Sequence, residues 1–388
     1  MLIYSITYFL NAIGAFVKKK ESDILRVLVL ILLVFISGTR YYMGGNDVLV
    51  YENTYNHVAS PQMILKYIFT GVNDGVNTNY ESGYLLFSSI IKSLHFSYFG
   101  FILIWTIIFY VLMVKGLEEF VSDWHIYIAV FMYKLMFYDT FISIRQGLTI
   151  AMFCFMLKYI RDRNWKVYFP LCLLALFEHS GAIILFPLYF ITYLPTSKRF
   201  IKMYAIAFLP TILISRYVDL SSAILKVADF LGNSKGEHWA ESSDKISLIH
   251  TLECYVIVVL ILIFYEKIIS SQHQKEAILS LQLFMIAIPM FTLFKEWIVL
   301  TREKDYFVMM YGLILGYIVE SHTTSVLYKD GEKLSIGNDF SGQKNASLIT
   351  LAIFAACFVG MVRYVRVFDG GVLMHFQSFI FQDVSIFR

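Results

Sequence analysis

The sequence predicts an all-α, polytopic integral membrane protein with about 11–12 transmembrane helices. Of its 388 residues, 58% are hydrophobic and only 16% are charged. The mean hydropathy is +0.65. A single soluble core of this size does not bury that much apolar surface, so the bilayer is the expected environment. The apolar residues also fall in runs of about the length that crosses the hydrocarbon region.

The predicted helices follow these apolar runs in order. Some runs are shorter than a full span of about 20 residues, which is why the count is given as a range. The runs are 1–17, 24–39, 97–115, 124–140, 143–160, 167–180, 181–195, 200–215, 248–265, 276–294, 305–320 and 347–362.

The whole chain, 1–388, is expected to form a single transmembrane domain with three long polar segments. Residues 40–96 are predicted to be an outer loop that contains an amphipathic or re-entrant helix. The stretch 83–96 is apolar but only about two-thirds of a span in length, with two basic side chains inside it. Residues 216–247 are a second outer loop. Residues 321–346, rich in Gly, Ser and Lys, are a flexible cytoplasmic loop.

The distribution of basic residues sets the orientation. The basic triplet Lys18–Lys20 follows the first apolar run, which indicates an uncleaved span with its N-terminus outside. Just over half of the 32 basic residues then fall on the cytoplasmic side, densely in short connections such as Lys158–Lys166.

Composition also excludes several kinds of chemistry. There are 32 Lys and Arg against 29 Asp and Glu, and a net charge of +3 gives no indication of a nucleic-acid partner. The four cysteines stand singly in apolar runs, as packing residues do, so neither a disulfide framework nor a zinc site is expected. The sequence has no Walker loop, no Gly-x-Ser-x-Gly elbow and no His-Glu-x-x-His motif.

Residues 143–181 predict a helical hairpin around which the other polar residues are arranged. Arg145 and Gln146 open its first helix, and Glu178 and His179 close its second. A basic turn separates the helices, so both polar ends reach the outer face. Ionisable groups at the edge of an apolar span are costly, and they are kept for pairing or function. We therefore expect one wall of an active site here.

Other polar residues fall on the same face. Arg40 and Asp47 follow the second apolar run, Glu81 precedes the short helix, and Arg302 and Asp305 begin a late helix. Each of them alone is equally well explained as a juxtamembrane anchor. Their convergence on one face favours a site.

The outer face thus carries three arginines and a histidine: Arg40, Arg145, Arg302 and His179. Arginine binds phosphate bidentately and keeps its charge, so this set predicts an anionic ligand at lipid-headgroup depth, such as a lipid diphosphate. His179 or a carboxylate such as Asp47 would be the general base toward a hydroxyl acceptor. We expect no metal cofactor, because arginines can supply the positive charge.

These motifs resemble the EpsG family, polytopic bacterial polymerases akin in role to the Wzy polymerases. The resemblance covers roughly residues 35–190 by motif, and it departs from the family pattern at Val48 and Ser82. Its most specific part is the Arg-Gln pair and the His-Ser pair, one hairpin apart. The matching positions are Arg40, Gly45, Asp47, Tyr51, Glu81-Ser82-Gly83-Tyr84, Ile144-Arg145-Gln146 and Phe177-Glu178-His179-Ser180, with a weaker match at Arg302 and Tyr306-Phe307.

The resemblance implies a GT-C-like, metal-independent glycosyltransferase of the bacterial inner membrane with a periplasmic active face. It would transfer a glycan from undecaprenyl diphosphate onto a lipid-linked repeat unit of O-antigen, capsule or exopolysaccharide. Besides this lipid-linked oligosaccharide and the bilayer, a chain-length regulator and a flippase are the expected partners. The catalytic residues implied are His179, Arg145 and Asp47. The substrate-binding residues implied are Arg40, Arg302, Glu81, Tyr51, Gln146 and Tyr306.

Three other classes compete with this interpretation. A flippase or transporter of lipid-linked oligosaccharide would also collect arginines, but it needs access to both faces and commonly shows repeat symmetry, which this sequence lacks. A membrane-bound acyltransferase would need a catalytic centre near a cytosolic donor, and the inner loops offer none. A purely structural subunit would tolerate the loss of every residue named.

Overall fold

A computed structural model describes residues 1–215, 246–270, 273–296, 302–323 and 340–388, together with residues 217, 226, 326–329 and 332–335. The described chain is almost wholly helical, which confirms the predicted all-α, polytopic membrane fold class. Three of its helices are long and apolar enough to cross a bilayer by length and composition: Tyr98–Leu117, Leu248–Ile269 and Lys344–Met374.

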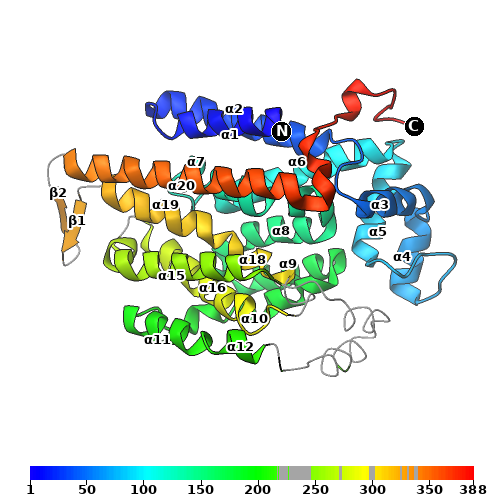
Figure 1. Cartoon of the computed structure of the whole chain (residues 1–388). Helices are drawn as coiled ribbons and strands as arrows, with labels where there is room; N and C mark the ends of the chain where they lie inside the picture. The colour runs from blue at the N-terminus through cyan, green and yellow to red at the C-terminus, as the bar shows by residue number, and fades with distance from the viewer. Residues whose placement is uncertain are drawn as a thin grey trace.

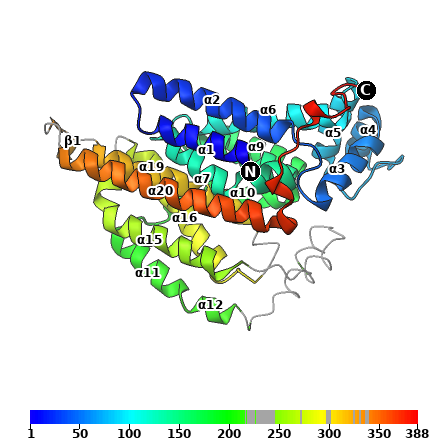
Figure 2. The same ribbon diagram turned by 45° about the horizontal axis from the view of Figure 1, so that its top comes forward.

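The long helices run side by side as one bundle (Figures 1 and 2). Helix α8 occupies its middle and packs against both α6 and α9, while α7 packs against α1, α19 and α20. The bundle helices are α1 (Leu2–Gly14), α2 (Lys19–Gly38), α6 (Tyr98–Leu117), α7 (Trp124–Lys134), α8 (Ile144–Arg161), α9 (Trp165–Glu178), α11 (Lys198–Phe208), α15 (Leu248–Ile269), α16 (Gln274–Phe291), α19 (Met310–Thr323) and α20 (Phe340–Val367).

Shorter helical elements join these helices. The apolar run expected at 181–195 is broken into three short pieces, and a π-helical turn precedes α8. The short elements are η1 (Tyr138–Ile142), η2 (Ser180–Ile184), α10 (Leu185–Leu188), η3 (Ile191–Tyr193), α12 (Thr211–Ile214), α18 (Asp305–Val308), η4 (Phe368–Met374) and η5 (Phe379–Phe381).

Three helices gather at one end of the bundle, beside the C-terminal segment (Figure 1). They are α3 (Asn46–His57), α4 (Pro61–Thr70) and α5 (Ser82–Ser93). Helix α5 packs against α9 through Gly83, where an added Cβ would lie 2.5 Å from the carbonyl oxygen of Phe177. The stretch 83–96, expected to be a re-entrant or interfacial helix, thus contributes a helix that is held against the bundle.

The opposite end of the bundle carries a two-stranded antiparallel hairpin (Figure 1). Its strands are β1 (Val326–Lys329) and β2 (Glu332–Ser335). They lie within the segment 321–346, which was expected to be a flexible cytoplasmic loop. The expected outer loop 216–247 falls almost entirely outside the described residues.

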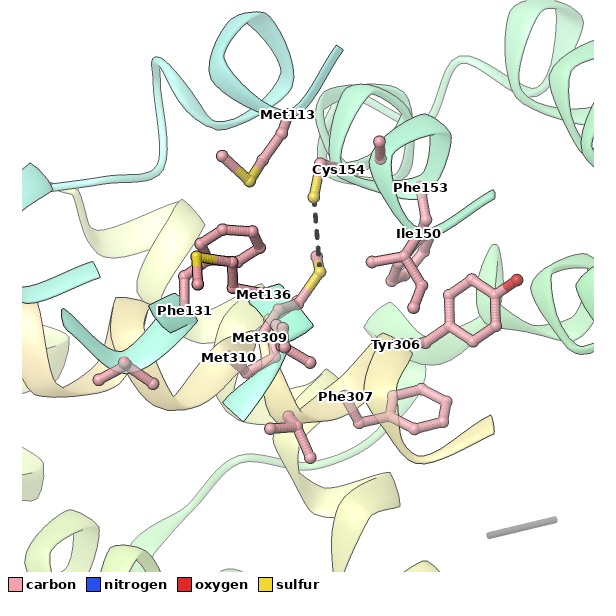
Figure 3. Close-up of a cluster of buried hydrophobic side chains, with 14 of the residues drawn as sticks. Met113, Phe131, Met136, Ile150, Phe153, Cys154, Tyr306, Phe307, Met309 and Met310 are labelled. Carbon is pink, nitrogen blue, oxygen red and sulfur yellow. Dashed lines mark hydrogen bonds between the residues drawn. The ribbon is translucent and has the colours of Figure 1, made fainter. Parts of the chain in front are cut away.

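A dense apolar core fills the space between α6, α7, α8 and the α18–α19 segment (Figure 3). The thiol of Cys154 on α8 donates a 3.5 Å hydrogen bond to the sulfur of Met309. Helices α6 and α8 approach so closely at Gly116 that an added Cβ would overlap the backbone of Cys154. Close-packed interiors resist changes of volume, so this core holds the two ends of α8 in fixed positions.

Candidate active site

The antiparallel pair of α8 and α9 brings two distant sequence motifs to the same end of the bundle. Arg145 lies in the first turn of α8, and His179 follows the last residue of α9. Glu81 immediately precedes α5, which packs on α9. The three side chains therefore meet at the end of the bundle that carries α3 to α5, as the hairpin pattern predicted for Arg145 and His179.

Glu81 is the centre of this cluster. Its carboxylate forms an ion pair with Arg145 through Oε2. The other oxygen, Oε1, accepts hydrogen bonds from the backbone N–H and the hydroxyl of Ser180, at 3.0 and 2.9 Å. The same oxygen lies 3.5 Å from Nδ1 of His179. One carboxylate thus joins the start of α8 to the end of α9.

Aromatic rings surround the guanidinium of Arg145. Its Cζ lies 5.9 Å from the ring centre of Tyr51, 5.1 Å from that of Tyr80 and 5.8 Å from that of Tyr84. Cations are attracted to the faces of aromatic rings, more strongly where water is excluded. These rings, together with Glu81, fix the position of the charge.

Gln146 ties a third part of the chain to the site. Its Nε2 donates a 2.6 Å hydrogen bond to the carbonyl oxygen of Arg302. The side chain of Arg302 is exposed, whereas that of the next residue, Glu303, is buried. The carboxylate of Glu303 lies directly beside Gly181 and faces His179.

Four buried polar atoms at this site have no hydrogen-bond partner among the described residues. They are Nε of Arg145, Oε1 of Glu178, Nδ1 of His179 and Oε2 of Glu303. Buried polar groups are nearly always satisfied, and each unsatisfied group costs free energy. Such a concentration of unsatisfied groups is what a site for a polar ligand requires.

The electrostatics set the protonation states of Glu81 and His179. Burial opposes ionisation of Glu81, but its interactions with His179, Arg145 and the backbone of Ser180 outweigh this and hold its pKa below its ordinary value. Burial lowers the pKa of His179, and the charges of Arg145 and Arg302 lower it further against the opposing effect of Glu81. At neutral pH, Glu81 is therefore ionised and His179 is neutral.

Three of the residues predicted for the site lie apart from this cluster. Arg40 is buried near the end of α2, where its guanidinium donates to the carbonyl of Ser37 and lies 5.2 Å from the ring centre of Phe141. Asp47 is exposed on the first turn of α3 and enters no hydrogen bond or ion pair described for the chain. Tyr306 lies in the apolar core (Figure 3). Its hydroxyl is hydrogen-bonded to Thr149.

Sequence reasoning missed Glu303, Tyr80 and Tyr84 as members of the site. The signal available for Glu303 was its position directly after Arg302 in the motif Thr-Arg-Glu-Lys-Asp. No local pattern indicates that this carboxylate packs against Gly181. Tyr80 and Tyr84 flank Glu81 on either side, which was a usable signal for side chains that enclose its ion-pair partner.

Among the described residues, no group of three or more His, Cys, Asp or Glu side chains is arranged to hold a metal ion. The ionisable groups at the site are instead the arginines, Glu81, His179 and Glu303.

The structure is thus an all-α membrane bundle with an Arg-Glu-His cluster at one end. The model of the EpsG family matches residues 23–327, which is most of the chain, and the protein belongs to this family. The family carries a polysaccharide-polymerase function of glycosyltransferase type. Searches of curated proteins and of solved structures found no match.

Proposed function

We propose that the protein polymerises a surface polysaccharide at the outer face of the bacterial inner membrane. It transfers a growing glycan from undecaprenyl diphosphate onto the terminal sugar hydroxyl of a new lipid-linked repeat unit, without a metal ion. The observation that carries this proposal is the ion pair of Arg145 with Glu81, which holds His179 within the same buried cluster.

The proposed reaction needs a group that accepts the proton of the acceptor hydroxyl. His179 is neutral at neutral pH, and Glu81 lies on its Nδ1 side. A hydrogen on Nδ1 is favoured by this carboxylate, so Nε2 carries the lone pair that can accept a proton. Glu81 also stabilises the imidazolium that forms. This arrangement of base and orienting carboxylate suits general base catalysis.

The leaving group is a lipid diphosphate, and its departure needs positive charge. Arg302 is exposed at the edge of the site, while Arg145 has an Nε that is unpaired among the described residues. Both guanidiniums can stabilise the charge that develops on the diphosphate oxygen as the bond to the anomeric carbon breaks. The polyprenyl tail would lie among the exposed apolar side chains of neighbouring helices.

The test is a deletion of the gene followed by complementation. Gel analysis of surface polysaccharide should show single repeat units in the deletion strain and full-length polymer after complementation with the native chain. His179→Ala should give single repeats although the protein is present in the membrane. Complete loss of surface glycan on deletion would instead indicate export, and normal chain length with His179→Ala would overturn the assigned role of the histidine.

A further inference from the structure

A second carboxylate faces the imidazole of His179, on the side opposite Glu81. Glycine at position 181 makes this possible. A Cβ added there would overlap Oε1 of Glu303 and would lie 3.0 Å from Nε2 of His179. Both atoms therefore lie against the α-carbon of Gly181, and the absence of a side chain at position 181 leaves room for the carboxylate.

Glu303 is poorly satisfied for a buried acid. Its side chain belongs to a residue that is 7% exposed, and Oε2 has no hydrogen-bond partner among the described residues. A buried structural carboxylate is ordinarily paired with a guanidinium or ammonium. A buried carboxylate that lacks such partners and faces a catalytic imidazole is suited to exchange protons with a ligand.

We propose that Glu303 and His179 together accept the proton of the acceptor sugar, whose reacting hydroxyl binds between the two side chains. This inference rests on the proposed polymerase function and assigns the acceptor subsite within it.

The bond changes balance without another reactant. The acceptor O–H bond breaks, and its proton passes to the Glu303–His179 pair. The acceptor oxygen forms a bond to the anomeric carbon of the donor glycan. The bond from that carbon to the diphosphate oxygen breaks, and its electron pair leaves on the lipid diphosphate. The proton is afterwards released to water, which regenerates the pair.

The surrounding charges predict where the pair titrates. Burial and, to a smaller extent, the charge of Asp305 raise the pKa of Glu303 to about 8 against the opposing effects of Arg302 and Lys304. His179 faces Glu81, Arg145 and Arg302, and its own pKa is lowered. Below about pH 8 Glu303 holds a proton and His179 alone can accept one, whereas above it both groups can.

The experiment is a pH profile of polymer formation by the full chain in phospholipid vesicles, supplied with lipid-diphosphate-linked repeat units from the deletion strain. For the native chain, the rate should rise with pH up to about 8. Glu303→Gln should lower the maximal rate by about 10²-fold. It should also move the rising limb to below pH 6.5, the ordinary pKa of histidine, because His179 then titrates alone.

Two further variants keep the test decisive. Glu119→Gln removes an exposed carboxylate at the opposite end of α8, where it pairs with Arg161, and it should leave the limb near pH 8. Gly181→Ala retains both titrating groups but separates them. It should shift the rising limb to lower pH, as Glu303→Gln does, and it provides the test if the Glu303→Gln protein does not fold. A folded Glu303→Gln or Gly181→Ala protein with an unshifted limb overturns the inference while the polymerase function stands. A native chain that forms no polymer overturns both.

Discussion

Helix α8 carries a largely buried arginine at each end, and the two arginines differ in how many of their nitrogens have a carboxylate partner. Arg145 in its first turn and Arg161 in its last have similarly buried side chains, 17% and 13% exposed. Arg161 binds Glu276 through Nη1 at 2.5 Å, and it binds two further carboxylates through Nη2 and Nε at 2.7 and 2.8 Å. Every nitrogen of that guanidinium has a carboxylate partner.

Among the described residues, Arg145 has a single carboxylate partner, Glu81, which it shares with Ser180 and His179. Its Nε is unpaired among the described residues, as are three neighbouring polar atoms. Side-chain exposure does not separate the two ends of α8, but hydrogen-bond satisfaction does. The Arg161 end is a completed ion-pair network between the turn after α6, α8 and α16, whereas the Arg145 end leaves capacity for a ligand.

The largest difference should come from exchanging each arginine for lysine. Lysine keeps the charge but loses the planar fork that binds two oxygens at once. Arg145→Lys should lower the rate of polymer formation by about 10²-fold or more, because the cluster that stabilises charge loses its geometry. Arg161→Lys should leave the rate within a few-fold of native, with a loss of stability of about 1 kcal/mol. Vesicle assays and thermal unfolding in detergent measure the two effects.

This comparison would fail if both lysine variants lost activity in proportion to their loss of stability. The Arg145 cluster would then be a structural ion pair like that of Arg161.

A second comparison uses two glycines at helix contacts. An added Cβ at Gly83 would press on the backbone of Phe177, two residues before His179, and one at Gly116 would press on the backbone of Cys154 in the core. Either alanine variant should cost about 1–3 kcal/mol through overpacking. Only Gly83→Ala should also lower the rate, by about 10-fold, because a shift of α5 against α9 moves Glu81 away from His179.

Equal rate losses for the two glycine variants, at equal thermal stability, would contradict this assignment. Such a result would mean that activity follows bundle integrity and not the position of α5.

The contrast between the two ends of α8 also marks what the sequence could predict. Apolar runs located the bundle helices, and the hairpin pattern placed Arg145 and His179 together, because antiparallel neighbours bring alternate ends to one side. Arg40 has the same local pattern, an arginine at the end of an apolar run. Tertiary packing directs it toward Phe141 instead. Which arginine joins a site depends on contacts between distant segments that no local pattern encodes.

Glu303 is the opposite case to Arg40, because it lies at the site although the sequence did not indicate it. Sequence spacing pointed to its neighbour Arg302, but the chain direction after Arg302 is set by the hydrogen bond from Gln146. That contact links positions 146 and 302, and it turns the carboxylate of Glu303 toward Gly181. Helices α3 and α4 were missed for a different reason, since their apolar periodicity is weak or short within a largely polar stretch.

A smaller effect is expected from the residue that holds the 302–305 segment. Gln146→Leu removes the donor to the carbonyl of Arg302 and leaves that oxygen unsatisfied, at a cost of about 1–3 kcal/mol. Gln282 on α16 offers a matched control, because its Nε2 donates to the carbonyls of Thr192 and Leu194 away from the site. Both leucine variants should lower the unfolding temperature. Only Gln146→Leu should slow polymer formation, and equal rates for the two would contradict the positioning role of Gln146.

The smallest effect should come from Asp47, the alternative base that the sequence left open. Its carboxylate is exposed and forms none of the described hydrogen bonds or ion pairs, so Asp47→Asn removes a solvated charge near Tyr51 and little else. The expected change in rate corresponds to less than about 1 kcal/mol, or under about fivefold. A loss as large as that of His179→Ala would place Asp47 in contact with the substrate. It would also require α3 to move toward the cluster when the lipid-linked sugar binds.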